Sequence, residues 1–366
     1  AAAVDAVEAL GQARQVLGGD AGAGVVHGKA RAAVRQALPL HRDAPARRGG
    51  AHRVGHQVGQ RALQLGRLTR QLDGSGAHVV GVVAHSTPEF HGIRLLACDL
   101  RDATHTSRVI AHTRPDVIYH LAAQAYVPKA LADPADTLIN NAVSQINILE
   151  ACRQADIDPV ILVVGSAEEY GDVSSDSLPI TEDQPLRPAN PYAVSKVTQD
   201  MLGLQYYLTY GMKIVRVRPF NHIGPGQSDR FVVANFARQI AEAEIGRSEP
   251  VLLTGNLDAE RDFLDVRDVV RAYTMVTRAA FAGQVFNVAG GVPRSIGWIL
   301  QFLLKRAAVP ITVTTDTARL RPADASVLYG DASRLREATG WEPVIPIERA
   351  LDETLAYWRE RVRTGR

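Results

Sequence analysis

The sequence predicts an α/β protein, in which a Rossmann-like, doubly wound parallel sheet is followed by a smaller α/β lobe. From residue 66 to residue 220, short apolar runs rich in Val and Ile alternate with longer segments whose apolar residues recur at helical spacing. Strands of that composition are buried on both faces, which requires helices above and below a parallel sheet. After Phe220, a Gly/Pro-rich loop and shorter elements predict a second lobe over residues 221–366, with some segments crossing back to the first.

Each element has a local signal. The runs "HVVGVV" and "PVILVVGSA" are apolar and rich in β-branched residues, as buried strands are. Strands are expected at 78–83, 94–100, 117–123, 159–167, 213–220, 251–255 and 283–290. Apolar spacing near 3.6 and helix-capping residues predict the helices. Helices are expected at 66–72, 107–114, 137–155 and 191–210, from the loop after Phe220 through Ala241, and at 265–280 with Asp265 as its cap.

Composition narrows the class of protein. The chain has 366 residues, 46% of them hydrophobic and 22% charged, and a formal net charge of +2. So small a charge argues against nucleic acid as the main partner, and no apolar run approaches the ~20 residues of a membrane helix. Cys98 and Cys152 are the two cysteines, and neither lies in a C-x-x-C motif, so we expect a reducing, cytoplasmic setting and no metal site.

The first 65 residues have an unusual composition. They contain no Ser, Thr, Ile, Phe, Tyr, Trp, Asn, Met or Cys. Alanines favour weak helix over residues 1–38, and the composition of 41–59 favours disorder. The abrupt change near Leu65 suggests the hypothesis that this segment is a GC-rich reading in the wrong frame. A natural Ala/Arg-rich extension is the alternative.

Reactive residues follow the strands that end at one edge of the predicted sheet. Ser166 follows one strand, and Tyr192 and Lys196 lie one turn apart on the helix that opens with Asn190 and Pro191. The lysine cation can therefore lie near the phenol and stabilise its ionised form. A phenol tuned in this way can serve as a proton donor near neutral pH. A solvated helix face for the Tyr/Lys pair and a turn role for Ser166 are the plainer alternatives.

These residues sit in motifs that resemble a known family. Ser166, Tyr192 and Lys196, together with "HLAAQ" and "NAVSQINILEA", resemble the extended short-chain dehydrogenase/reductases, the NAD-dependent epimerase/dehydratase family, which act on nucleotide sugars. The resemblance runs from about Gly66 to Arg366. "GSAEEYG", "RPFNHIGPGQSDRFV" and "GNLDAERDFLDVRDVV" are most similar to its reductases of GDP-4-dehydro-6-deoxy-D-mannose.

The resemblance implies a reaction and a set of residues. NADPH or NADH would deliver hydride to C4 of the keto sugar and yield GDP-D-rhamnose, while Tyr192 protonates the oxygen, Ser166 holds it and Lys196 binds the nicotinamide ribose. The implied cofactor-binding residues are Gly66, Asp99, Leu100, Leu121, Ala122, Ala123, Asn141, Tyr192 and Lys196. For Asn141, which the family uses to help position the lysine, a polar helix face is an equal alternative. The family also implies a homodimer.

The substrate side carries three residues and one ambiguity. Asn221, Arg261 and Arg321 resemble the residues that contact the sugar diphosphate, and a guanidinium fork suits phosphate oxygens. Glu168 occupies the position at which related GDP-mannose 4,6-dehydratases carry a base. A dehydratase, or another nucleotide-sugar epimerase or dehydratase, is therefore an alternative function, and an inactive nucleotide-sugar-binding protein is a second. Ser166, where the dehydratases would have Thr, favours the reductase.

One family motif is missing. Its Gly-x-x-Gly-x-x-Gly turn, which lets backbone amides approach the cofactor pyrophosphate, belongs at residues 60, 63 and 66. Gln60 and Leu63 replace the first two glycines, and Gly66 alone is kept. We therefore expect this chain to bind the dinucleotide poorly. The end of the second strand, "VVAHS", does not distinguish NAD from NADP.

Overall fold

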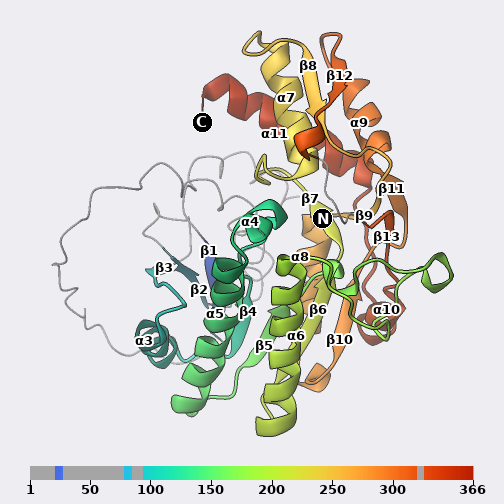
Figure 1. The fold of residues 1–366 in the computed structure, drawn as a ribbon. Helices are drawn as coiled ribbons and strands as arrows, with labels where there is room; N and C mark the ends of the chain where they lie inside the picture. Colours follow the sequence, from blue (N-terminus) through green and yellow to red (C-terminus); the bar gives the residue numbers. More distant parts are fainter. Residues whose placement is uncertain (1–20, 28–77, 85–93, 320–324, 366) are drawn as a thin grey trace.

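The computed structural model describes residues 21–27, 78–84, 94–319 and 325–365, and its centre is a seven-stranded sheet (Figure 1). The strand order is β10-β6-β5-β4-β1-β2-β3. These strands are β1 (Ala21–His27), β2 (His78–Val83), β3 (Arg94–Ala97), β4 (Val117–His120), β5 (Val160–Val164), β6 (Ile214–Pro219) and β10 (Val285–Val288). The α/β class and the mainly parallel sheet that the sequence predicts are confirmed.

One inner strand, β1, breaks the parallel pattern. β1 pairs antiparallel with both β2 and β4, whereas β4, β5, β6 and β10 form one parallel ladder and β2 and β3 another. The expected weak helix over residues 1–38 is therefore wrong for Ala21–His27, which pairs with strands on both sides. The rest of that segment lies outside the described residues, as does the helix expected at 66–72.

Helices cover both faces of the sheet. Ile118 and Ile161 pack against the helices of one face, and their neighbours Tyr119 and Leu162 pack on the other, as the alternation of a strand requires. The first face carries α3 (Ala103–Thr113), α5 (Pro134–Gln154) and α6 (Pro191–Tyr210). The second face carries α8 (Val266–Val276) and α10 (Ser333–Thr339). In Figure 1, α5 and α6 stand side by side in front of the sheet.

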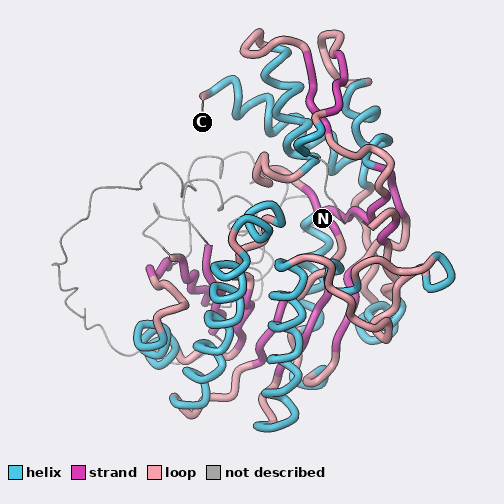
Figure 2. Tube along the Cα trace, viewed as in Figure 1, coloured by secondary structure: helices cyan, strands magenta, loops and turns pink. Residues whose placement is uncertain are grey.

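The second lobe lies beyond the carboxyl ends of β4, β5 and β6 and has its own apolar core, built mainly from helices (Figure 2). Its helices are α7 (Val232–Glu244), α9 (Ile296–Leu304) and α11 (Ile347–Thr364). Its strands are β7 (Asn221–Ile223), β8 (Val251–Thr254), β9 (Glu260–Asp265), β11 (Pro293–Ser295), β12 (Thr312–Thr315) and β13 (Val327–Leu328). α4 (Val127–Ala132) lies between β4 and α5 in sequence.

Local signals predicted most of these elements. The helix over 191–210 and the strand over 78–83 are confirmed to the residue, and Asp265 caps α8 by accepting from the Arg267 amide. Several expectations are wrong in detail. The strands expected over 117–123 and 159–167 end at His120 and Val164, and the helix expected over 265–280 ends at Val276. The strand expected over 94–100 ends at Ala97. The loop expected after Phe220 contains β7, which pairs with the later strand β9.

Candidate active site

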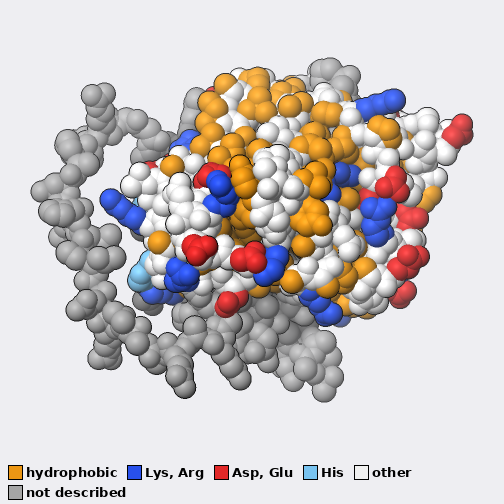
Figure 3. Space-filling view, turned by 90° about the horizontal axis from the view of Figure 1, so that it is seen from below, with side chains coloured by type: hydrophobic (Ala, Val, Ile, Leu, Met, Phe, Trp, Pro, Cys, Tyr) orange, Lys and Arg blue, Asp and Glu red, His pale blue; other side chains and the backbone are white. Residues whose placement is uncertain are grey.

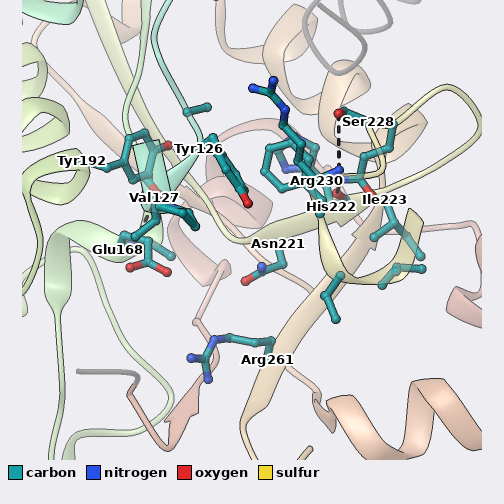
Figure 4. A pocket seen from close by; sticks show the side chains of 18 of the residues that line it. Tyr126, Val127, Glu168, Tyr192, Asn221, His222, Ile223, Ser228, Arg230 and Arg261 are labelled. Atoms are coloured by element: carbon teal, nitrogen blue, oxygen red, sulfur yellow. Dashed lines mark hydrogen bonds between the residues drawn. The ribbon is translucent and has the colours of Figure 1, made fainter. Parts of the chain in front are cut away.

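A cavity of ≈ 880 Å³ opens between the carboxyl ends of β4, β5 and β6 and the second lobe. Most of the predicted catalytic and substrate residues line it. They are Ser166, Glu168, Tyr192, Lys196, Asn221 and Arg261. Figure 4 shows the Tyr192, Glu168, Asn221 and Arg261 side chains round one opening. The fold thus brings together residues that lie far apart in the chain.

The start of α6 places Tyr192 and Lys196. The Asn190 side chain accepts from the Ala193 amide, and Pro191 occupies the first turn, so the helix begins where the sequence predicts. Lys196 is 5% exposed, and its Nζ donates to the Val164 carbonyl at 2.8 Å and to Gln199 Oε1 at 2.9 Å. These two hydrogen bonds therefore hold the Lys196 ammonium against the end of β5.

Ser166 lies in a capped turn directly after β5. Its hydroxyl accepts from the Glu168 amide at 3.2 Å, while its own amide donates to Glu169 Oε1 at 2.7 Å. This reciprocal pair is a capping box on the short helix Ala167–Tyr170. Gly165 has no side chain to collide with the Glu169 carboxylate, which approaches its Cα closely. Ser166 is consequently fixed by both sides of the turn.

Glu168 is fixed from the neighbouring helix. Its Oε2 accepts from Asn190 Nδ2 at 3.0 Å, and its side chain lines the cavity. One carboxamide thus caps α6 with its oxygen and holds Glu168 with its nitrogen. The Glu168 carboxylate therefore lies in the cavity and is bonded to the residue that begins α6, the helix that carries Tyr192.

A buried charged cluster lies behind Ser166 and Lys196. Asp200 accepts from Arg216 at 2.6 Å and from Arg218 at 2.8 Å, and Arg218 also approaches Glu169 at 3.4 Å. Burial raises the pKa of Glu169 well above its usual value, and the nearby Asp200 raises it further against the opposing Arg218. Two arginines and two acids therefore form one buried cluster beneath the site.

Several predicted cofactor residues lie apart from the cavity lining. Leu121 and Ala123 line it, whereas Ala122 and Leu100 pack in the core. Asp99 forms a bidentate pair with Arg101 at 3.0 Å and 2.6 Å. Gly66 and Arg321 lie outside the described residues.

Asn141 is fully buried on α5 and does not bond to Lys196 through its side chain. Its Nδ2 donates to Ser195 Oγ at 2.7 Å and to the Gln124 carbonyl, and its Oδ1 accepts from the Gln124 amide. The polar helix face that was the alternative for Asn141 is wrong, because this side chain ties α5 to α6 and to the segment after β4.

The second lobe adds cations that sequence reasoning missed. Arg230 and Arg319 line the same cavity as Arg261. Arg230 lies over the Tyr126 ring at 5.5 Å, and Figure 4 shows the two side chains next to each other. Arg319 lies two residues before the predicted Arg321 and donates to Asn235 Oδ1 at 2.9 Å. The stretch "RPAD" resembles the family motif and so indicated Arg321, whereas the stretch "ARL" around Arg319 matches no motif.

His222 follows the same strand end as Asn221 and also lines the cavity. Its Nδ1 lies 3.1 Å from the Phe220 carbonyl. Burial lowers the pKa of His222, with the Phe220 carbonyl and Asp265 opposing the shift. The imidazole is therefore favoured in its neutral form.

Within the part of the chain that the structure describes, no group of three or more His, Cys, Asp or Glu side chains is arranged to hold a metal ion. None of the helices described there combines the length and apolar character needed to span a bilayer. The site is thus an arrangement of a phenol, a lysine, a serine and several arginines at the ligand-facing edge of an α/β sheet. That combination defines a nucleotide-dependent α/β enzyme.

Comparison with known proteins places this class in a family. The family model described as GDP-mannose 4,6 dehydratase matches residues 68–354. GDP-6-deoxy-D-mannose reductase from Pseudomonas aeruginosa is 42% identical over 249 residues, which are 68% of this chain and 82% of that protein. UDP-glucose 4-epimerase from Mycolicibacterium smegmatis is 29% identical over 280 residues, or 76% of this chain and 86% of that protein.

Two solved structures share the fold. RMD from P. aeruginosa complexed with NADPH superposes with a TM-score of 0.71 at 36% identity, covering 81% of this chain and 96% of that one. UDP-glucose 4-epimerase from Thermus thermophilus in complex with NAD gives a TM-score of 0.72 at 25% identity, with coverage of 81% and 96%.

The chain therefore belongs to the NAD-dependent epimerase/dehydratase family, the extended short-chain dehydrogenase/reductases. Within that family it is a homologue of GDP-6-deoxy-D-mannose reductase. The family and the oxidoreductase class that the motifs predicted are confirmed.

Proposed function

We propose that this chain uses NADPH or NADH to reduce the 4-keto group of GDP-4-dehydro-6-deoxy-D-mannose to GDP-D-rhamnose. The observation that carries the proposal is the meeting of Ser166, Tyr192 and Lys196 in one cavity that also holds Arg261 of the second lobe. The reductase homologue at 42% identity supplies the substrate class.

In this proposal each side chain has one task. Tyr192, 9% exposed, gives its proton to the sugar oxygen, and Ser166, fixed by its capping box, donates to the same oxygen. Lys196 holds the ribose of the nicotinamide nucleotide, which when bound supplies the hydride. Arg261 and Asn221 bind the diphosphate, and a bidentate guanidinium is well suited to that charge. Arg230 and Arg319 add positive charge to the same wall.

The described residues fit the nicotinamide half of the cofactor better than the pyrophosphate half. Lys196 and Tyr192 lie at the carboxyl end of the parallel strands, where this half binds. β1 runs antiparallel to β4, so its carboxyl end lies at the opposite edge of the sheet. β1 therefore cannot lead into a phosphate-binding turn at the ligand edge, and we infer weak dinucleotide binding by this chain. A cofactor fluorescence titration giving micromolar affinity would contradict that inference.

The function is tested by supplying the keto sugar with NADPH or NADH and following loss of absorbance at 340 nm together with the sugar product. Tyr192→Phe keeps the ring and removes the proton donor, so turnover should fall by ~10²–10⁴-fold, the range of general acid catalysis, while GDP binding measured by calorimetry stays within about threefold. Full activity in Tyr192→Phe would show that Tyr192 is not the proton donor. If no form turns over but GDP binding persists and is weakened by Arg261→Met, the chain is a nucleotide-sugar-binding protein.

A 4,6-dehydratase is the second candidate, favoured by Glu168, which lines the cavity and is held by Asn190. GDP-mannose with a catalytic amount of NADP⁺ or NAD⁺ separates the two functions. A dehydratase converts it to the 4-keto sugar without net consumption of cofactor, and Glu168→Gln should abolish that conversion. The reductase leaves GDP-mannose unchanged.

We also propose that two copies associate through the outer faces of α5 and α6. Large apolar side chains are exposed there, including Ile139 at 55%, Val194 at 40% and Leu208 at 70%. Figure 3 shows apolar side chains gathered over the upper and central part of one side of the molecule, with charged side chains beside and below them. Light scattering should give a dimer mass that Leu208→Glu reduces to that of a monomer. An unchanged mass in that variant would exclude this surface.

A further inference from the structure

The Lys196 ammonium is held by the side chain of Gln199, to which neither the Tyr/Lys motif nor the similarity to known proteins assigns a role. Gln199 lies one turn further along α6 and is 1% exposed. Its Oε1 accepts from Lys196 Nζ at 2.9 Å, and its Nε2 donates to the Asn141 carbonyl at 2.9 Å and faces His120 Nε2 at 3.1 Å. Both ends of one buried carboxamide are therefore used, by three different elements.

The neighbours leave this carboxamide one orientation. Lysine has donors and no acceptor, so the atom that faces Lys196 must be oxygen. The Asn141 carbonyl only accepts, so the atom that faces it must be nitrogen. His120 Nε2 must then accept, which places the proton of the neutral imidazole on Nδ1. A rotation of the amide by 180° would set donor against donor at Lys196 and acceptor against acceptor at Asn141.

We propose that Gln199 is a positioning residue of the active site, whose single allowed orientation, set by the Asn141 carbonyl, holds the Lys196 ammonium at the end of β5. The inference rests on the proposed function, in which Lys196 binds the nicotinamide ribose beside Tyr192. Val164 supplies the second fixed acceptor at 2.8 Å. Val164 and Gln199 thus fix the directions of two N–H bonds of the Lys196 ammonium. Because the ammonium is tetrahedral, the direction of its third N–H bond is then fixed as well.

The chain offers a matched control. Gln145 has the same side chain, is also 1% exposed and lies on the facing helix α5. Its Nε2 donates to the Gln199 backbone carbonyl at 2.7 Å, so it belongs to the same packing layer without a bond to Lys196. Replacing either glutamine with Met keeps the volume and removes a buried polar partner. Both variants should lose stability, and Gln199→Met alone should affect the lysine.

The test measures Lys196 in the full chain without substrate. Competitive acetylation with acetic anhydride, followed by mass spectrometry from pH 6 to 11, gives the midpoint at which Lys196 becomes nucleophilic. Loss of a charge-assisted hydrogen bond destabilises the buried ammonium, so Gln199→Met should lower this midpoint by about one pH unit. Gln199→Glu puts a carboxylate beside the cation and should raise it by about one unit. Gln145→Met should leave it within about 0.3 units.

Two outcomes decide the proposal. Opposite shifts in the two Gln199 variants, with no shift in Gln145→Met, support a positioning role. Midpoints that match wild type in both Gln199 variants would overturn it, because the carboxamide would then only fill space. Gln199→Glu keeps the side-chain length and the acceptor for Lys196 but sets an oxygen against the Asn141 carbonyl, so circular dichroism first checks that it folds. If Gln199→Met fails to fold, a folded Gln199→Glu still decides. Because the measurement needs neither cofactor nor sugar, it stands if the proposed reductase activity fails.

Discussion

The buried cluster beneath the active site makes a quantitative prediction for Asp200→Asn. Asp200 accepts from Arg216 and Arg218, and the three side chains are only 1%, 7% and 4% exposed. The substitution keeps the shape and removes the charge, which leaves two buried guanidinium groups with Glu169 as the remaining acid. Burial still raises the pKa of Glu169 after the Asp200 charge is removed, so Glu169 compensates only in part. Breaking a buried pair in this way should lower the free energy of unfolding by about 3–5 kcal/mol.

An exposed ion pair of the same length provides the control. Lys213 and Asp158 approach at 2.6 Å, but their side chains are 39% and 59% exposed. Asp158→Asn should cost less than about 1 kcal/mol, and 0.5 M NaCl should remove most of that difference. Urea unfolding of the three proteins at pH 7, with and without salt, measures both values. If Asp200→Asn costs no more than Asp158→Asn, the reasoning from burial is refuted.

Two further predictions concern buried contacts of the fold. Burial raises the pKa of Asp262 from 3.8 to about 6, against three backbone amides that lower it, so the folded protein holds a proton that the unfolded chain releases. The free energy of unfolding should therefore decrease by up to ~3 kcal/mol as pH rises from about 4 to about 6, at about 1.4 kcal/mol per pKa unit. A difference between wild type and Asp262→Asn that is constant over pH 4–7 would contradict this. Gly165→Ala places a methyl group against the Glu169 carboxylate and should cost about 1–3 kcal/mol and slow turnover. Gly211→Ala, at φ +68° with open space around it, should cost about 1 kcal/mol and spare turnover, and equal effects of the two glycine changes on turnover would rule out the collision.

Local sequence predicted the parts of the site that depend on local physics. Asn190 and Pro191 mark a helix start, and the spacing of Tyr192 and Lys196 puts them on one face, so the helix that carries these two residues could be placed before any coordinates. Ser166 could be placed because a β-branched strand ends just before it. These signals need only neighbouring residues.

What sequence reasoning missed depends on contacts between distant segments. β7 forms because Asn221–Ile223 meets β9, and nothing within a Gly/Pro-rich stretch indicates that partner. A glutamine in a helix is usually solvated, and Gln199 is buried only because α5 packs on α6. Arg230 and Arg319 resemble surface arginines until the second lobe places them on the cavity wall. For Asn141, the family motif indicated the right neighbourhood, and the bonds to Gln124 and Ser195 could be known only from the fold.

Asn190 both caps α6 and holds Glu168, and these two contacts restrict which amino acids can replace it during evolution. Serine, threonine, aspartate and asparagine all start helices well. Aspartate would set a second negative charge against Glu168, and the hydroxyl of serine or threonine is about one bond too short to copy both contacts. Of the four good helix starters, asparagine alone satisfies both demands. Relatives that keep an acid at position 168 should therefore keep asparagine at position 190. Relatives that lose the acid should accept other helix-capping residues at position 190.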